Sequence, residues 1–245
     1  MAMEDTSPAK SGKFREETRF GIRPETISIQ IREPGSALTH LAGLILVCIG
    51  AGPLIMRAKL YGSAYTVAGV LIFLLGSILL YAASTVYHTV VLDLEKTTFF
   101  RKLDHSTISI MIAGTYTAVC LTYLRGSVGF HLLAAIWPLA ILGVLLKLFW
   151  ITCPKWISSL LYALMGWLCV FSMGAILNAL PPAAFGLLLA GGIFYTVGAV
   201  IYAMHPRAFD AKHIYFGSHE IFHVFIMLGT FCHYLMMWIF LVHVG

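Results

Sequence analysis

Long apolar stretches follow one another along most of this chain. A helix needs about 20 residues to cross the hydrocarbon core of a bilayer, and each stretch is near or above that length. They are too long for buried strands and lack the alternation that membrane barrels show. The pattern therefore predicts an all-α fold, a bundle of seven transmembrane helices. The predicted spans cover approximately residues 38–56, 64–88, 105–124, 128–149, 156–177, 183–204 and 216–243.

Two parts of the pattern define the remaining organisation. Residues 156–204 contain no charged residue, but Asn178 is followed closely by Pro181 and Pro182, which predict a tight turn between the fifth and sixth spans. Residues 1–32 are polar and basic, and we expect them to form a flexible tail ahead of a membrane domain over residues 33–245. No cleavable signal peptide is evident, so the first span would itself direct insertion.

Composition and charge agree with a membrane protein. The chain is 59% hydrophobic and only 11% charged, whereas soluble domains carry about 25% charged residues. The formal charge of +5 does not predict a nucleic-acid partner, because most Lys and Arg residues lie in the tail and in short loops. If every stretch crosses once, thirteen of the sixteen Lys and Arg residues lie on one side, with Lys147 and Lys155 counted in its loop between the fourth and fifth spans. This excess places the N-terminus in the cytoplasm and the C-terminus outside.

Several ionisable residues fall near the predicted cytoplasmic ends of the spans, where each is a functional candidate because such groups are costly in a membrane. His219 and His223 are four residues apart, so they share one helical face, as two ligands of one metal ion would. His88 ends the second span and is the candidate third ligand. Three imidazoles leave the fourth position of a zinc ion open. Asp104 would then accept a proton from the attacking water, and Ser84 would orient the substrate or donate to an oxyanion.

Two other interpretations of these residues stay open. A pair of histidines four residues apart can simply serve packing or hydrogen bonding. Residues 219–223 also read as HExxH, the zinc metallopeptidase signature in which Glu220 would be the general base. Glu220 lies about 100° around the helix from His219, so it need not face the metal. We expect Glu33, His40 and Glu220 to lie around the metal ligands rather than to bind the ion.

Three segments together resemble the hemolysin III family, within the broader progestin and adipoQ receptor group. They are Glu33-Pro-Gly-Ser-Ala-Leu-Thr-His40, Ser84-Thr-Val-Tyr-His88 with Lys102-Leu-Asp104, and Gly217-Ser-His219-Glu-Ile-Phe-His223. The resemblance implies zinc on the cytoplasmic side, bound by His88, His219 and His223, with Asp104 reaching it through water and Ser84 nearby. Ser36 stands where eukaryotic receptors of the group tend to have Asn, and their long N-terminal domain is absent, so the chain looks like a bacterial member.

Three functions follow from this reading. The first is a zinc-dependent hydrolase of lipid amide or ester bonds in the plasma (inner) membrane, because the resemblance extends to membrane enzymes that cleave lipid amides such as ceramides and to bacterial proteins of membrane-lipid homeostasis. The second is a receptor-like or homeostatic membrane protein with a structural zinc. The third is a pore-forming cytolysin, which is disfavoured because the ionisable residues gather near one face. Membrane lipids are the expected partners in each case.

Overall fold

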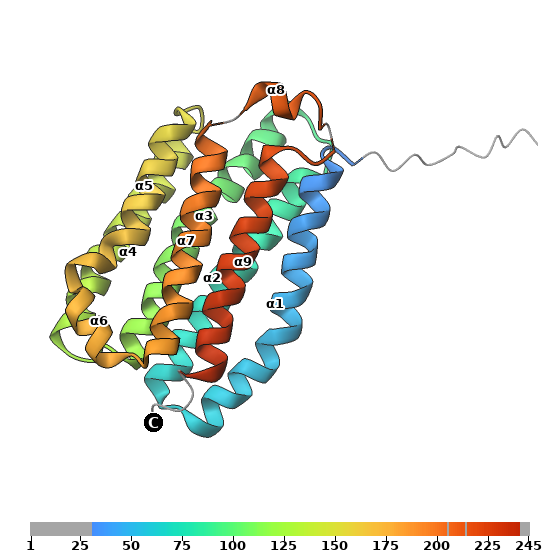
Figure 1. The fold of residues 1–245 in the computed structure, drawn as a ribbon. Coiled ribbons are helices and arrows are strands. Elements are labelled where there is room, and N and C mark those ends of the chain that lie inside the picture. Colours follow the sequence, from blue (N-terminus) through green and yellow to red (C-terminus); the bar gives the residue numbers. More distant parts are fainter. Residues whose placement is uncertain (1–30, 205, 214, 241–245) are drawn as a thin grey trace, which may run out of the picture.

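The computed structural model describes residues 31–204, 206–213 and 215–240, and this part of the chain is helical, with no strand among its residues. The N-terminal tail predicted for residues 1–32 lies almost wholly outside the described residues. Figure 1 shows the helices as a bundle of long, roughly aligned rods. They are α1 (Pro34–Tyr61), α2 (Ala64–Thr89), α3 (Leu94–Thr122), α4 (Ser127–Phe149), α5 (Lys155–Trp167), the 3₁₀ turn η1 (Leu168–Ser172), α6 (Met173–Ala179), α7 (Pro182–Met204), the short α8 (Arg207–Asp210) and α9 (Ser218–Ile239).

The helices close into a ring. Each of α1 to α4 packs against the next helix in the chain, α5 packs against α7, and α7 packs against α9. The last helix, α9, returns to α1, so the two ends of the membrane domain lie side by side (Figure 1). This closure brings the start of α9 next to the start of α1 and the end of α2, at the top of Figure 1.

Local sequence signals determine where the helices begin and end. Pro34 occupies the first turn of α1, where a missing backbone N–H costs nothing. Ser63 and Asp93 cap α2 and α3, each accepting a hydrogen bond from the backbone N–H three residues on. Because Pro182 starts α7 only three residues after α6 ends, the predicted turn between the fifth and sixth spans is confirmed.

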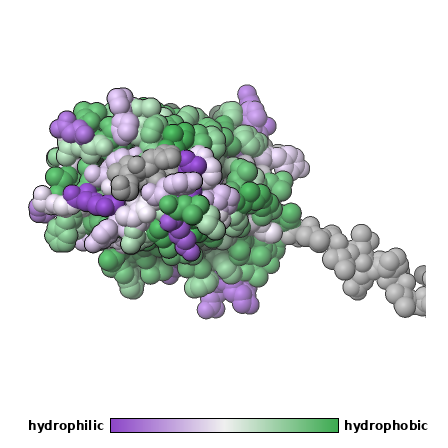
Figure 2. All heavy atoms as spheres, turned by 90° about the horizontal axis from the view of Figure 1, so that it is seen from below, coloured by the Kyte–Doolittle hydropathy of each residue, from purple (hydrophilic) through white to green (hydrophobic). Residues whose placement is uncertain are grey.

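Six helical segments are long and apolar enough to cross a membrane, within the described part of the chain. They are α1, α2, α4, the α5–η1–α6 segment, α7 and α9. Many large apolar side chains on them point outward, among them Leu46 at 63% exposed and Leu164 at 60% exposed. Figure 2, which views the bundle from the end where α1 finishes, shows hydrophobic residues around most of its outline. Lipid rather than water is the solvent that suits this outer surface.

The helix α3 is as long as these six but differs in composition. It begins eleven residues before the predicted start at residue 105, and its first turns carry Glu95, Lys96 and other charged residues. The rest of α3 is rich in Ser and Thr, and most of those side chains are buried against other helices. Because neighbouring helices surround this part of α3, it needs no lipid-compatible exterior.

One charged residue lies elsewhere than predicted. Lys147 was expected in a loop, but it lies inside the last turns of α4 and is only 2% exposed. Its ammonium group donates hydrogen bonds to Ser158 Oγ and, over 3.2 Å, to Cys153 Sγ. The prediction was wrong because the helix continues past this charge, and the side chain folds back toward the start of α5.

Candidate metal centre

Three histidines from two helices meet at one end of the bundle, which we call the histidine end. His88 lies in the last turn of α2, and His219 and His223 lie in the first two turns of α9. One ring nitrogen from each lies within 4.8 Å of the other two. His88 Nε2 and His219 Nε2 are 3.3 Å apart. The structure therefore brings together the three residues predicted as metal ligands.

The donor set fits a tetrahedral zinc ion. Nitrogens that lie 2.0–2.1 Å from such an ion are about 3.3–3.4 Å apart, close to the separation of His88 and His219. His88 and His223 are 2% and 1% exposed, so their positions are fixed by packing. Three imidazole ligands would leave the fourth position open, which is the arrangement of catalytic rather than purely structural zinc sites.

The outer nitrogens of two of these rings are held by residues of α1 and its entry. His88 Nδ1 lies 2.5 Å from Glu33 Oε2, and because a carboxylate only accepts, Nδ1 carries the proton. Nδ1 of His223 lies 3.0 Å from Thr39 Oγ1, whose own proton goes to the backbone carbonyl of Gly35 or Ser36. Both histidines are thereby left with Nε2 free to bind a metal, as outer partners of metal-binding histidines do.

The charge of Glu33 is also favoured by this arrangement. The hydrogen bond from His88 holds the pKa of Glu33 below its ordinary value near 4.5, although partial burial opposes the shift. Glu33 precedes α1 and its side chain is 45% exposed. Glu33 thus contacts a candidate metal ligand, and its place around a bound metal stays a prediction. Thr39 was not among the predicted residues. The position of Thr39 next to His40 was the only signal in the sequence that could have identified Thr39.

A fourth histidine lies against the cluster. The ring of His40 stacks on the ring of His223, with centroids 3.5 Å apart and planes within 9° of parallel. Tyr81 meets the other side of His40 edge-on. Neither ring nitrogen of His40 has a hydrogen-bond partner among the described residues. His40 thus packs against the ring of a candidate ligand, and its place around a bound metal stays a prediction.

Asp104 lies on α3 and lines the same cavity as His40, His219 and His223. Its side chain is almost wholly buried, and its Oδ2 is 3.3 Å from His105 Nδ1. The same nitrogen is 2.9 Å from the carbonyl of Arg101. His105 therefore lies directly beside the predicted proton acceptor.

The remaining predicted residues have other surroundings. The Glu220 carboxylate accepts hydrogen bonds from Ser36 Oγ and from the backbone N–H of Gly217, so it caps α9 and joins α9 to α1. This use does not favour the peptidase reading, in which Glu220 would act as a base. Ser84 lies one turn before His88 and is fully buried, but it is not among the residues that line the cavity.

A long cavity begins at Asp104, His219 and His223 and continues through the bundle. Its wall comes mainly from α3, the α5–η1–α6 segment, α7 and α9. Beyond the histidine end the lining is largely apolar, and it continues to Leu124 and Leu132 near the opposite end. The cavity therefore joins a cluster of ionisable groups to a hydrophobic interior, which suits a molecule with a polar head and a hydrocarbon chain.

The fold and this cluster define a class: a multi-pass helical membrane protein with a buried group of histidines at one end of an internal cavity. Comparison with known proteins then identifies the family. Residues 29–234 match the family described as haemolysin-III related, and the chain belongs to that family. It is 35% identical over 198 residues to the "Hemolysin-3 homolog" of Bacillus subtilis (strain 168), covering 81% of this chain and 89% of that protein. It is 38% identical over 199 residues to the "Hemolysin-3" of Bacillus cereus, covering 81% and 86%. No solved structure matches the chain significantly.

Proposed function

We propose that this protein is a zinc-dependent hydrolase that cleaves an amide or ester bond of a membrane lipid. The observation that carries the proposal is the convergence of three imidazoles, two of which, His219 and His223, line the polar end of a cavity whose other walls are mainly apolar. His88, His219 and His223 would hold the ion. When bound, zinc would make a water nucleophilic near neutral pH and polarise the scissile carbonyl.

The residues of the chain divide the remaining work. Asp104 lines the cavity beside the histidines, where its carboxylate would accept the proton of the attacking water. His105, in contact with Asp104, would hold that carboxylate in place. Glu33 and Thr39 keep two ligands in the tautomer that leaves Nε2 available. The apolar part of the cavity would hold the hydrocarbon chain and so position the carbonyl at the histidine end. Ser84 remains a candidate for orienting the substrate.

The same proposal includes seven crossings, with α3 as the third span. Six apolar segments and the place of α3 between α2 and α4 in the ring support this count. The excess of Lys and Arg in the tail and in the loops on the same side as the tail supports an N-terminus in the cytoplasm. The histidine end would then lie near the inner leaflet of the plasma (inner) membrane.

The test is metal content together with lipid hydrolysis. Purified protein in detergent should hold about one zinc per chain and release fatty acid from at least one member of a panel of N-acyl lipid amides and acyl esters, measured by mass spectrometry. Asp104→Ala should keep the zinc and lose turnover by at least about 100-fold, because a general base contributes 10²–10⁴-fold. Asp93→Asn, at the exposed start of α3, is the matched control. Unchanged turnover in Asp104→Ala would reject this mechanism.

A structural role for the metal is the second candidate, favoured by the placement of the ligands. The three histidines come from α2 and α9, and their partners Glu33 and Thr39 come from α1 and its entry, so one ion would tie three segments together. If chelation lowers the unfolding temperature markedly and no lipid in the panel is cleaved, the ion stabilises a receptor-like bundle instead.

A further inference from the structure

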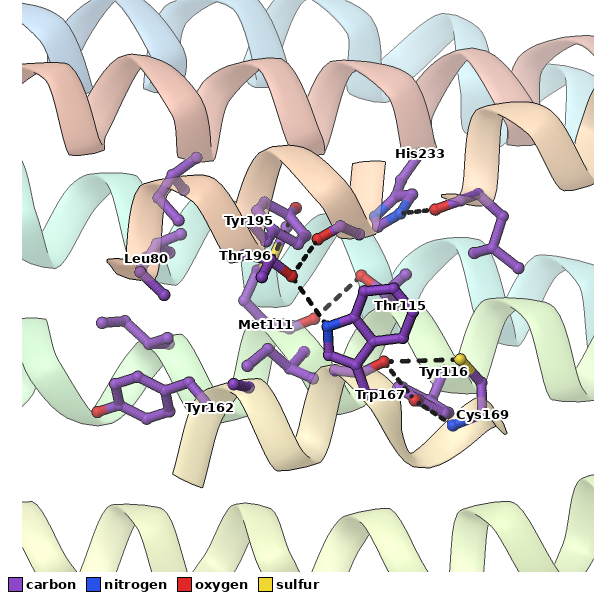
Figure 3. Close-up of a pocket in the computed structure, with 18 of the residues that line it drawn as sticks. Leu80, Met111, Thr115, Tyr116, Tyr162, Trp167, Cys169, Tyr195, Thr196 and His233 are labelled. Atoms are coloured by element: carbon purple, nitrogen blue, oxygen red, sulfur yellow. Dashed lines mark hydrogen bonds between the residues drawn. The ribbon is translucent and has the colours of Figure 1, made fainter. Parts of the chain in front are cut away.

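A third histidine of α9 lines the same cavity far from the metal cluster. His233 is 4% exposed and lines the cavity ten residues beyond His223. At the rise of an α-helix, ten residues place it about 15 Å further along the bundle. Figure 3 shows His233 among the residues of this part of the cavity, with Tyr195 and Thr196 of α7 and Trp167 near by.

The hydrogen bonding of His233 fixes which nitrogen carries its proton. Nε2 lies 3.2 Å from the backbone carbonyl of Leu188, and a carbonyl can only accept, so Nε2 is the donor (Figure 3). In the neutral ring Nδ1 is therefore an acceptor. It is buried and has no hydrogen-bond partner among the described residues.

The polar side chains near His233 already have hydrogen-bond partners. Thr230 Oγ1 accepts a hydrogen bond from Tyr81 at 2.7 Å, lies 3.1 Å from the Tyr195 hydroxyl and donates to the carbonyl of Ile226. Trp167 donates its indole N–H to Thr196 Oγ1, which donates in turn to the carbonyl of Gly192.

Two other cavity-lining residues in the described part of the chain carry buried polar atoms without a partner, namely His40 and Ser159. Both lie toward the histidine end, near the starts of α1 and α5. Among the described residues, Nδ1 of His233 is thus the buried acceptor without a partner in the deeper, apolar half of the cavity. Leaving such a group unpaired costs free energy, which a ligand that donates a hydrogen bond would recover.

We propose that His233 recognises a hydroxyl group on the hydrocarbon chain of a lipid held in this cavity. The proposal rests on the proposed function, since it takes the scissile carbonyl to lie at the histidine end, and it narrows the substrate to hydroxylated acyl lipids. The hydroxyl would donate to Nδ1, with the apolar wall holding the carbons on either side. Because the two sites are about 15 Å apart along α9, the hydroxyl should lie roughly a dozen carbons from the carbonyl.

Binding of fatty acids tests this without requiring hydrolysis. The probes are octadecanoate and its 2-, 9-, 12- and 16-hydroxy derivatives, with affinities measured by native mass spectrometry on the full chain in detergent. Wild-type protein should bind the 12-hydroxy acid about 3- to 10-fold more tightly than octadecanoate, as one net hydrogen bond allows. The 2- and 16-hydroxy acids should show no gain. Equal affinity for all the acids, or no binding of any, would overturn the proposal.

His233→Phe keeps a ring but removes the acceptor, so the preference for the 12-hydroxy acid should fall to none. His131→Phe, at an exposed position of α4, should retain it. If the preference persists in His233→Phe, a different group recognises the hydroxyl. Should that variant not fold, the position series on the wild-type chain decides by itself.

The same series in Asp104→Ala separates the two proposals. A retained preference in that variant, with no hydrolysis by the wild-type chain, supports the His233 subsite while the hydrolase proposal fails. Hydrolysis by the wild-type chain without any hydroxyl preference supports the hydrolase and rejects the subsite.

Discussion

The two ends of α9 use the same side chain in different ways. At its start, His219 and His223 meet His88, with three ring nitrogens within 4.8 Å of one another. Toward its end, a single ring, that of His233, has one nitrogen on a backbone carbonyl and the other unpaired. Convergence is what distinguishes them: several imidazole acceptors aimed at one point suit a cation, whereas one isolated acceptor suits a neutral hydrogen-bond donor.

The largest expected effect is the loss of zinc affinity at the histidine end. His88→Ala removes one of three ligands and should lower zinc affinity by more than about 1000-fold, beyond the 10–100-fold that loss of an outer partner costs. His233→Ala, on the same helix as the other two ligands, should leave zinc affinity unchanged. Competition with chelators of known affinity measures both. Equal metal loss in the two variants would mean that general destabilisation, not ligation, is being observed.

The next largest effect tests how Glu33 holds the histidine cluster in place. Glu33→Gln keeps the shape of the side chain but removes the negative charge of the group that accepts the hydrogen bond from His88 Nδ1. Zinc affinity should fall by 10–100-fold, which corresponds to about 1.4–2.7 kcal/mol. Glu95→Gln, in the first turn of α3, is the control that removes an equal charge away from the cluster. If the two substitutions weaken zinc binding equally, Glu33 acts only through net charge.

Much of the arrangement at the histidine end could be predicted from the sequence. Spacing places His219 and His223 on one face whatever the fold, because four residues make about one helical turn. The same argument does not place Thr39, whose role depends on α1 packing beside α9, two segments 184 residues apart in sequence at the Thr39–His223 contact. Glu220 shows the converse: its motif indicated a catalytic base, but its side chain caps its own helix.

The interior of the bundle was harder to predict from the sequence. The fifth span was predicted as one helix, and no proline interrupts residues 155–179. It nevertheless contains the 3₁₀ turn η1, where Tyr116 of α3 donates to the carbonyl of Gly166 and accepts from the N–H of Cys169. A distant phenol thus satisfies the backbone groups that the irregularity frees, and no local pattern encodes such a contact. The sequence does not reveal the free acceptor of His233 for the same reason, since the donor role of its Nε2 is set by the carbonyl of Leu188 on another helix.

The smallest effect tests the deep end of the cavity through two adjacent glycines of α7. A Cβ added at Gly191 would lie 2.3 Å from His233 Nε2, whereas one added at Gly192 meets nothing within 4 Å. Gly191→Ala should therefore displace the ring from the carbonyl of Leu188 and destabilise the bundle by about 1–2 kcal/mol, the lower part of the range for overpacking.

Gly192→Ala serves as the matched control for that substitution. It should be neutral or slightly stabilising, because alanine favours the helix over glycine. Unfolding in detergent, followed by circular dichroism, measures both free energies, and the zinc content of both variants should stay that of the wild type. Equal stability of the two variants would show that α7 and α9 do not approach each other closely at His233. A loss of zinc in Gly191→Ala would show that the two ends of α9 are coupled and do not act as separate sites.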